Sequence, residues 1–145
     1  MSRQQVESLI PHRHPFLWVD RIIETEEGRI VTEKLIDADL PLFAGHYPDR
    51  PIFPGALLCE AMFQSGALLM ASRQGEPSAE PLLPLVTRIL GAKFKRPVSP
   101  GEVLRMTVTL TERLSTAYTF HGVAKVHEKT VASVDFVCML HRPPP

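Results

Sequence analysis

The segment Gly45–Ser72 constrains the fold more than any other stretch, because it joins a proline-rich loop to a strongly apolar helix. Three prolines fall within seven residues of its first part, Gly45–Gly55, and proline fixes φ and removes a backbone donor. That part is therefore predicted to be a stiff loop that holds His46 in one place. From Ala56 to Ser72, 12 of 17 residues are apolar, which predicts a long helix with no polar face of any width.

Two polar residues, Glu60 and Gln64, stand inside this helix, which is expected to start at Pro54-Gly55. They are one turn apart and lie on the same side of the helix. A buried carboxylate is costly unless it has a partner or a task, so Glu60 is a candidate functional residue. A rigid loop with a histidine that leads into a buried helix with a carboxylate is the feature that most suggests a functional site.

A helix that is apolar on all sides has to be covered on most of them, and this requirement predicts the architecture. Other segments supply about five or six antiparallel strands, so we expect an α+β fold in which an antiparallel sheet wraps around one long central helix. One sheet from a chain of this length covers much of such a helix but not all of it. We therefore expect a second copy of the chain to complete the burial, with twofold symmetry.

Apolar alternation and turn residues predict the remaining elements. A short helix is expected at Arg3–Ile10, and strands are expected at Phe16–Glu24, Arg29–Ile36, Leu85–Phe94, Leu104–Leu110, Ala117–Val126 and Thr130–Leu140. Connections are expected at Thr25–Gly28 (a hairpin turn), Asp37–Ala44 (a loop or short helical turn), Arg73–Pro84 (a surface connection), Pro97–Gly101 (a turn) and His141–Pro145 (a loose tail). The sequence has no internal repeat, so residues 1–145 are expected to form one domain.

Composition argues against several classes of function. Lys plus Arg and Asp plus Glu number 16 each, so the charge balance gives no sign of nucleic-acid binding. The first residues are polar and the long helix contains Glu and Gln, so we expect no secretion signal, no membrane span and a cytoplasmic location. Cys59 and Cys138 lie in apolar segments and are expected to be buried free thiols. His12 and His14 are too few to hold a metal, and no cofactor is expected.

Three blocks of sequence carry a resemblance to an enzyme family. They are Leu9–Ile22 (LIPHRHPFLWVDRI), Gly45–Gln64 (with the pattern G-H-[FY]-P-x-x-P-x-x-P-G-x-L-x-x-E-A-x-x-Q) and Ala92–Leu104 (AKFKRPVSPGEVL). In these blocks and in their order the chain resembles the FabZ type of β-hydroxyacyl-(acyl-carrier-protein) dehydratase, a hot-dog-fold enzyme of type II fatty-acid synthesis. The resemblance implies removal of water from (3R)-3-hydroxyacyl thioesters on acyl carrier protein to give trans-2-enoyl thioesters.

The resemblance also implies roles for four residues. His46 matches the family's catalytic histidine, and Glu60 matches its catalytic carboxylate. Gly55 matches the glycine whose backbone N–H binds the thioester carbonyl, and Gln64 matches a glutamine that helps to hold the carboxylate. In the family the two catalytic residues come from different subunits, so a homodimer is the smallest active unit, and many members are trimers of dimers.

Elimination of water needs residues of these types. A base must take the weakly acidic proton at carbon 2, and a neutral histidine such as His46 suits this task near pH 7. The hydroxyl at carbon 3 is a poor leaving group unless it is protonated, and a buried Glu60 is expected to have a raised pKa and to stay protonated as the acid. A second division of the two proton transfers stays open, in which His46 transfers both protons and Glu60 positions a water molecule or the hydroxyl.

Other interpretations stay open beside these. Lys93, Lys95 and Arg96 are either a solvated strand face or part of a docking surface for the acidic carrier protein. The chain is alternatively a hot-dog thioesterase, a polyketide-type dehydratase on a specialised acyl chain, or a non-catalytic acyl-binding homologue. The His46 and Glu60 pair fits elimination better than thioester hydrolysis, and an inactive homologue would be expected to have lost one of the two.

Overall fold

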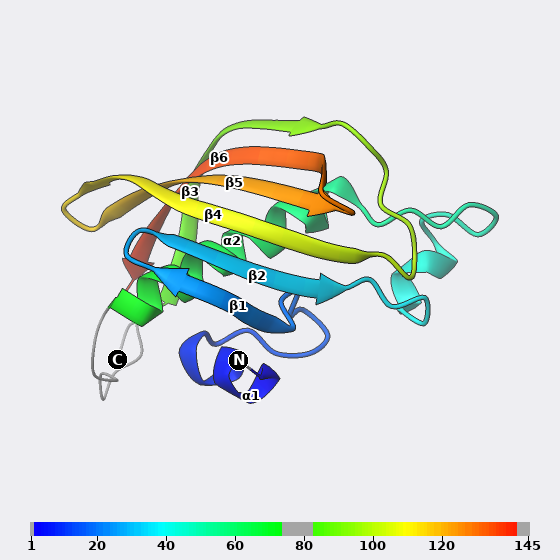
Figure 1. Ribbon diagram of the computed structural model, residues 1–145, viewed down its shortest axis with the longest axis horizontal. Coiled ribbons are helices and arrows are strands. Elements are labelled where there is room, and N and C mark those ends of the chain that lie inside the picture. The colour runs from blue at the N-terminus through cyan, green and yellow to red at the C-terminus, as the bar shows by residue number, and fades with distance from the viewer. Residues whose placement is uncertain (1, 74–82, 142–145) are drawn as a thin grey trace.

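The computed structural model describes residues 2–73 and 83–141. Its elements are α1 (Arg3–Leu9), β1 (Arg21–Glu26), β2 (Arg29–Leu35), the 3-10 helix η1 (Pro41–Ala44), α2 (Gly55–Arg73), β3 (Leu83–Phe94), β4 (Val103–Leu114), β5 (Ala117–Val126) and β6 (Lys129–His141). The six strands form one sheet in the order β1-β2-β4-β5-β6-β3, and every neighbouring pair is antiparallel. In Figure 1 this sheet curves over α2. The predicted α+β fold, an antiparallel sheet around one long helix, is therefore confirmed.

Helix α2 forms the centre of the hydrophobic core, as its composition predicts. It begins at Gly55 and ends at Arg73, one residue beyond the predicted end, and most side chains from Leu58 to Met70 are buried. By length and composition alone α2 could cross a membrane, but 67% of its apolar window is buried inside the fold. That degree of burial is typical of the core helix of a globular protein.

One glycine lets the helix and the sheet approach closely. At Gly66 an added Cβ would lie 3.1 Å from ring atoms of Phe136. The Phe136 ring is fully buried and packs against the rings of Phe63 and Phe120, so it has little room to move. The close packing with the sheet accounts for a glycine in the middle of α2, where glycine otherwise disfavours the helix.

The strand predicted at Phe16–Glu24 is wrong in its first half, because β1 begins only at Arg21. The backbone of Phe16 and Trp18 is bonded to a side chain of α2, and only Asp20, next to β1, bonds the backbone of β2. The N–H of Trp18 donates to Oε1 of Gln64 at 2.8 Å, and the carbonyl oxygen of Phe16 accepts from Nε2 of Gln64 at 2.9 Å. Of the apolar residues that suggested a strand, Leu17, Trp18 and Val19 are buried, whereas Phe16 is exposed.

The other predicted elements are present, with changes mainly at their ends. The main changes are that β3 begins at Leu83, that β4 continues to Leu114, and that η1 occupies Pro41–Ala44 within the predicted loop or helical turn. The predicted surface connection Arg73–Pro84 is wrong at its ends, because Arg73 belongs to α2 and Leu83 and Pro84 belong to β3. The rest of that connection, residues 74–82, and residues 142–145 of the predicted tail lie outside the described residues.

The two edges of the sheet differ in chemistry. Strand β1 is short and exposes charged side chains such as Arg21 and Glu24, which discourage pairing with another strand. Strand β3 has twelve residues and, within the part of the chain that the structure describes, pairs on one side only, with β6. Its large exposed apolar side chains, with their exposed fractions, are Leu85 (45%), Val86 (37%), Ile89 (57%), Leu90 (50%) and Phe94 (54%). A long apolar edge strand of this kind is a template for pairing with a second chain.

Candidate active site

The loop after η1 holds His46 by hydrogen bonds. Nδ1 of His46 lies 2.8 Å from the carbonyl oxygen of Ile52, and the N–H of Ile52 donates to the carbonyl oxygen of His46 at 3.0 Å. Because a carbonyl oxygen only accepts, Nδ1 carries the proton of the neutral ring and Nε2 presents a lone pair. The ring also stacks on Tyr47, with 4.1 Å between the ring centroids. His46 is therefore oriented with a basic nitrogen available.

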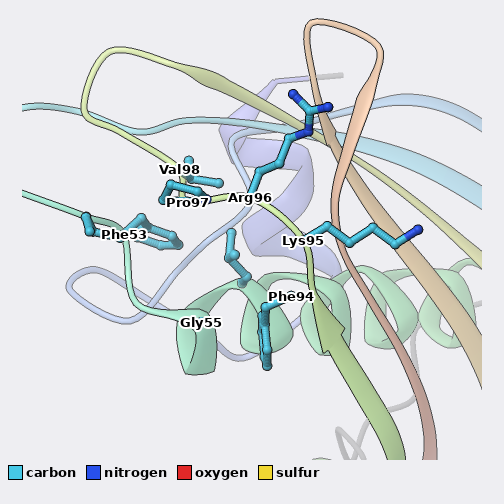
Figure 2. Close-up of a pocket in the computed structure, with 9 residues that line it drawn as sticks. Phe53, Gly55, Phe94, Lys95, Arg96, Pro97 and Val98 are labelled. Atoms are coloured by element: carbon cyan, nitrogen blue, oxygen red, sulfur yellow. The ribbon is translucent and has the colours of Figure 1, made fainter.

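The first turn of α2 borders a cavity of about 320 Å³. Gly55 is the first residue of the helix, so its N–H has no acceptor within the helix, and the helix dipole places partial positive charge there. A Cβ at Gly55 would lie 3.0 Å from the ring of Phe94, so only glycine fits without moving that ring. Figure 2 shows Phe94 beside the first turn of α2, with Lys95 to Val98 continuing past the cavity.

Glu60 lies further along α2 and is held by Gln64. Nε2 of Gln64 donates to Oε2 of Glu60 at 3.0 Å. Gln64 is itself fixed, because only 1% of it is exposed and it also bonds the backbone of Phe16 and Trp18. Burial raises the pKa of Glu60, and the hydrogen bond from Gln64 opposes this rise only in part. The carboxyl group is therefore biased toward its protonated form.

A second cavity, of about 400 Å³, contains Glu60. Most of its lining is apolar: Phe16, Phe63, Ala67, Pro84, Leu85, Val86, Ile89 and Cys138. His12 and Glu60 are the polar side chains of the lining. Burial raises the pKa of Cys138 to about 12, so its thiol stays neutral. The cavity therefore surrounds a protonatable carboxyl group with apolar side chains.

His12 is the residue of this site that the sequence analysis missed. It was considered only as half of a metal pair with His14. Its Nε2 lies 4.0 Å from Oε2 of Glu60, and burial together with the charge of Arg13 lowers the pKa of His12. Among the residues that the structure describes, no group of three or more His, Cys, Asp or Glu side chains could hold a metal ion. The one signal for His12 in the sequence was its place in the block Leu9–Ile22.

Within one chain the two predicted catalytic residues are not brought together. Among residues 2–73 and 83–141, no hydrogen bond or ion pair joins His46 to Glu60. Ile52, which holds His46, lines the cavity at the start of α2, whereas Glu60 lines the second cavity. Both cavities border β3, the first at Phe94 and the second near Leu85.

The three predicted docking residues, Lys93, Lys95 and Arg96, are all exposed at the end of β3. Lys95 and Arg96 also line the first cavity. Figure 2 shows both of these side chains extending away from Gly55. Positive charge therefore lies at the rim of the cavity at the start of α2.

Comparison with protein families and sequences shows what the chain is similar to. The model of a family described as the FabA-like domain matches residues 10–135. A 3-hydroxyacyl-[acyl-carrier-protein] dehydratase FabZ of Paracidovorax citrulli (strain AAC00-1) is 39% identical over 141 residues, which cover 97% of this chain and 97% of that protein. The FabZ dehydratase of Anaeromyxobacter sp. (strain Fw109-5) is 38% identical over 142 residues, which cover 97% of this chain and 90% of the relative.

Solved structures share the fold at lower sequence identity. The dehydratase heterocomplex ApeI:P from Xenorhabdus doucetiae superposes with a TM-score of 0.79 at 16% identity, covering 96% of this chain and 91% of that chain. The PaaI protein of the E. coli phenylacetic acid degradation operon superposes with a TM-score of 0.65 at 19% identity, and the match covers 81% of this chain and 80% of that chain. These are hot-dog proteins, so the expected hot-dog fold is confirmed.

Proposed function

The chain belongs to the FabA-like domain family and is a 3-hydroxyacyl-[acyl-carrier-protein] dehydratase of the FabZ type, and from this premise we propose how its residues carry out the reaction. The enzyme removes water from 3-hydroxyacyl chains on acyl carrier protein in fatty-acid biosynthesis. We assign the reaction to His46 and Glu60, with Gly55 and Gln64 in support. We further propose that residues 1–145 form one domain that works in the cytoplasm without a cofactor.

His46 is the base in this proposal. Its hydrogen bond to the carbonyl oxygen of Ile52 is the observation that carries the assignment, because it leaves the Nε2 lone pair as the proton acceptor. Nε2 takes the proton from carbon 2 of the substrate. The thioester carbonyl, where negative charge then develops, accepts a hydrogen bond from the N–H of Gly55 at the positive end of α2.

Glu60 is the acid in this proposal. The raised pKa of Glu60 keeps a proton available for the hydroxyl at carbon 3, which then leaves as water. Gln64 holds one oxygen of the carboxyl group, so the proton is delivered from a fixed position. The products are a trans-2-enoyl thioester and water. His46 ends the step protonated and Glu60 ends it as a carboxylate, so a proton returns from His46 to Glu60, through solvent, before the next turnover.

A homodimer brings the two groups together. If two β3 strands pair antiparallel about the middle of the strand, the Phe94 end of one lies against the Leu85 end of the other. The cavity near His46 of one subunit then meets the cavity of Glu60 in its partner. Such pairing also covers the exposed apolar side chains of β3.

Lys93, Lys95 and Arg96 are proposed to attract the acyl carrier protein. They are exposed, and two of them line the cavity at the start of α2. An acidic carrier would meet complementary charge close to the point where the acyl chain enters.

A hydration assay tests the assignment. The protein is incubated with a 2-enoyl thioester, and loss of the conjugated-enoyl absorbance is followed as water adds. We expect turnover that His46→Ala lowers by about 10²–10⁴-fold, as for loss of a general base. His141→Ala is the matched control, since His141 is exposed at the end of β6.

Two results would contradict the proposal. If His46→Ala keeps a rate near that of the unmodified enzyme, the role of His46 is wrong. Release of free thiol without hydration would instead assign the site to thioester hydrolysis.

A further inference from the structure

The side chain of His12 faces the acid of the site from outside the helix that carries it. Nε2 of His12 lies 4.0 Å from Oε2 of Glu60, the same oxygen that accepts the hydrogen bond from Gln64. The two residues belong to segments 48 positions apart, and the fold brings them into one cavity.

The backbone around His12 is fixed by its neighbour. The guanidinium group of Arg13 donates hydrogen bonds to three carbonyl oxygens, those of Glu7, Ile10 and His12, at 2.7–2.8 Å. These bonds tie the loop to the end of α1. The position of the imidazole is therefore set by the fold rather than by the contact with Glu60.

The surroundings of Nδ1 decide which nitrogen of His12 carries the proton. Nδ1 is sealed from solvent and has no hydrogen-bond partner among the described residues. Nδ1 is unpaired in either tautomer, but a proton on Nε2 points at an acceptor, Oε2 of Glu60, whereas a proton on Nδ1 would be a buried donor without one. The neutral ring therefore carries its proton on Nε2, the nitrogen that faces Glu60.

We propose that His12 is a positioning residue whose Nε2–H, together with the side-chain N–H of Gln64, fixes Oε2 of Glu60 and leaves Oε1 to hold the acid proton toward the substrate. The separation of 4.0 Å is longer than a hydrogen bond and has to shorten when substrate fills the cavity. Catalytic hydrogen bonds commonly tighten in this way on binding. The inference rests on the proposed role of Glu60.

The other titratable groups around Glu60 carry no charge that would compete with the contact between His12 and Glu60. They are the thiols of Cys59 on α2 and Cys138 on β6, and the pKa of each is raised by burial and by Glu60. Both thiols are therefore neutral. Burial and Arg13 lower the pKa of His12, so its ring is neutral as well and acts as a donor rather than as a cation.

The tautomer of His12 is measured in the unmodified enzyme, so this test needs no variant. Long-range ¹H–¹⁵N correlation spectra of the imidazole rings distinguish the two neutral forms. We expect the ring of His12 to carry its proton on Nε2. A proton on Nδ1 would overturn the inference.

Two matched variants test the contact with Glu60. A glutamine places its amide close to the position of Nε2, whereas an asparagine places its amide close to Nδ1. We expect His12→Asn to lower kcat about tenfold, the equivalent of one hydrogen bond, and His12→Gln to keep kcat close to that of the unmodified enzyme.

The titration of Glu60 separates positioning from a structural effect. The carboxyl carbon of Glu60 is followed by ¹³C NMR in glutamate-labelled enzyme, and Glu60→Gln identifies its signal. Loss of a donor to the carboxylate should raise the pKa of Glu60 in His12→Asn and leave it unchanged in His12→Gln. Equal titration in both variants would contradict the inference. Failure of the proposed function would appear instead as absent hydration in the unmodified enzyme.

Discussion

At the scale of single residues, Gln64 bonds both to the backbone before β1 and to the carboxyl group of Glu60. It ties the segment from Phe16 to Trp18 onto α2, and it donates to Glu60. All polar atoms of its side chain are used in these bonds. A residue with this many buried partners is expected to stabilise the fold as well as to hold the proposed acid.

Replacement of Gln64 by leucine is therefore expected to destabilise the fold. The change leaves the N–H of Trp18 buried without an acceptor, which costs about 1–3 kcal/mol of unfolding free energy. Urea denaturation measures this loss. Gln4→Leu, on the exposed side of α1, is the control and should change stability little. An equal loss in both variants would contradict the role given to Gln64.

The raised pKa of Glu60 predicts that Glu60→Gln stabilises the fold, and that this stabilisation depends on pH. Between the ordinary value of 4.5 and the higher value in the fold, the folded protein binds more protons than the unfolded chain, so this group makes the unfolding free energy fall as pH rises. Glutamine has no such dependence. The variant should melt close to the unmodified enzyme at about pH 4 and at a higher temperature at about pH 8. If the difference in melting temperature between the variant and the unmodified enzyme narrows toward high pH, burial does not raise the pKa of Glu60.

Four of the proposed site residues could be named from the sequence because they lie close together along the chain, and their roles stay predictions. The single block Gly45–Gln64 contains His46, Gly55, Glu60 and Gln64, and its helical part places the last two on one side. His12 was not predictable in this way, because no periodicity links it to a position 48 residues later. The tertiary fold alone creates that contact.

At the scale of elements, the apolar edge strand β3 has the largest consequence. Its side chains stay exposed in the single chain, while the opposite edge, β1, carries charges. An unpaired strand of this composition favours association over solubility. We therefore expect the stability of the dimer to depend on β3 more than on other exposed apolar positions.

Ile89→Lys tests this expectation. Ile89 is 57% exposed in the middle of β3, and a lysine there places a charge at the proposed twofold contact. We expect the dimer dissociation constant to rise about 30-fold or more, as for an interface residue whose replacement costs about 2 kcal/mol of binding free energy. Sedimentation measures the association. Leu114→Lys, at a position 65% exposed at the end of β4, is the control and should leave the dimer intact.

The helices and strands that could be predicted are those whose own residues carry the sequence signal. The composition of α2 and the alternation in β4 each identify one structure, and both elements were predicted. Phe16–Trp18 has the composition of a strand but is held by a helical side chain, and the sequence gives no local sign of that partner. The charged β1 and the apolar β3 look alike as strands, so their places at the two edges came only from the sheet order.

At the scale of the whole molecule, the separation of the two cavities in one chain is the reason for proposing that the dimer takes part in the chemistry. His46 and Glu60 each have their supporting contacts within their own chain, His46 from Ile52 and Glu60 from Gln64. The proposed β3 pairing supplies what one chain lacks, which is the approach of the two groups to each other. Each dimer then contains two equivalent sites.

Mixed dimers test this division of labour. His46→Ala and Glu60→Gln are each expected to be inactive alone. When equal amounts are unfolded together and refolded, half of the dimers are mixed, and one of the two sites in each mixed dimer has both native residues. Hydration activity should return to about a quarter of that of the unmodified enzyme. No recovery, with mixed dimers confirmed by mass spectrometry, would show that both groups act from one chain.

Trp18 gives the enzyme an optical reporter that spans both halves of its site. It is the single tryptophan of the sequence, and its indole N–H is buried without a partner among the described residues. Its ring contacts Phe53 beside the cavity at the start of α2, with 5.5 Å between centroids, while its backbone is bonded to Gln64. Its fluorescence is therefore expected to respond to changes beside both the proposed base and the proposed acid without an added dye.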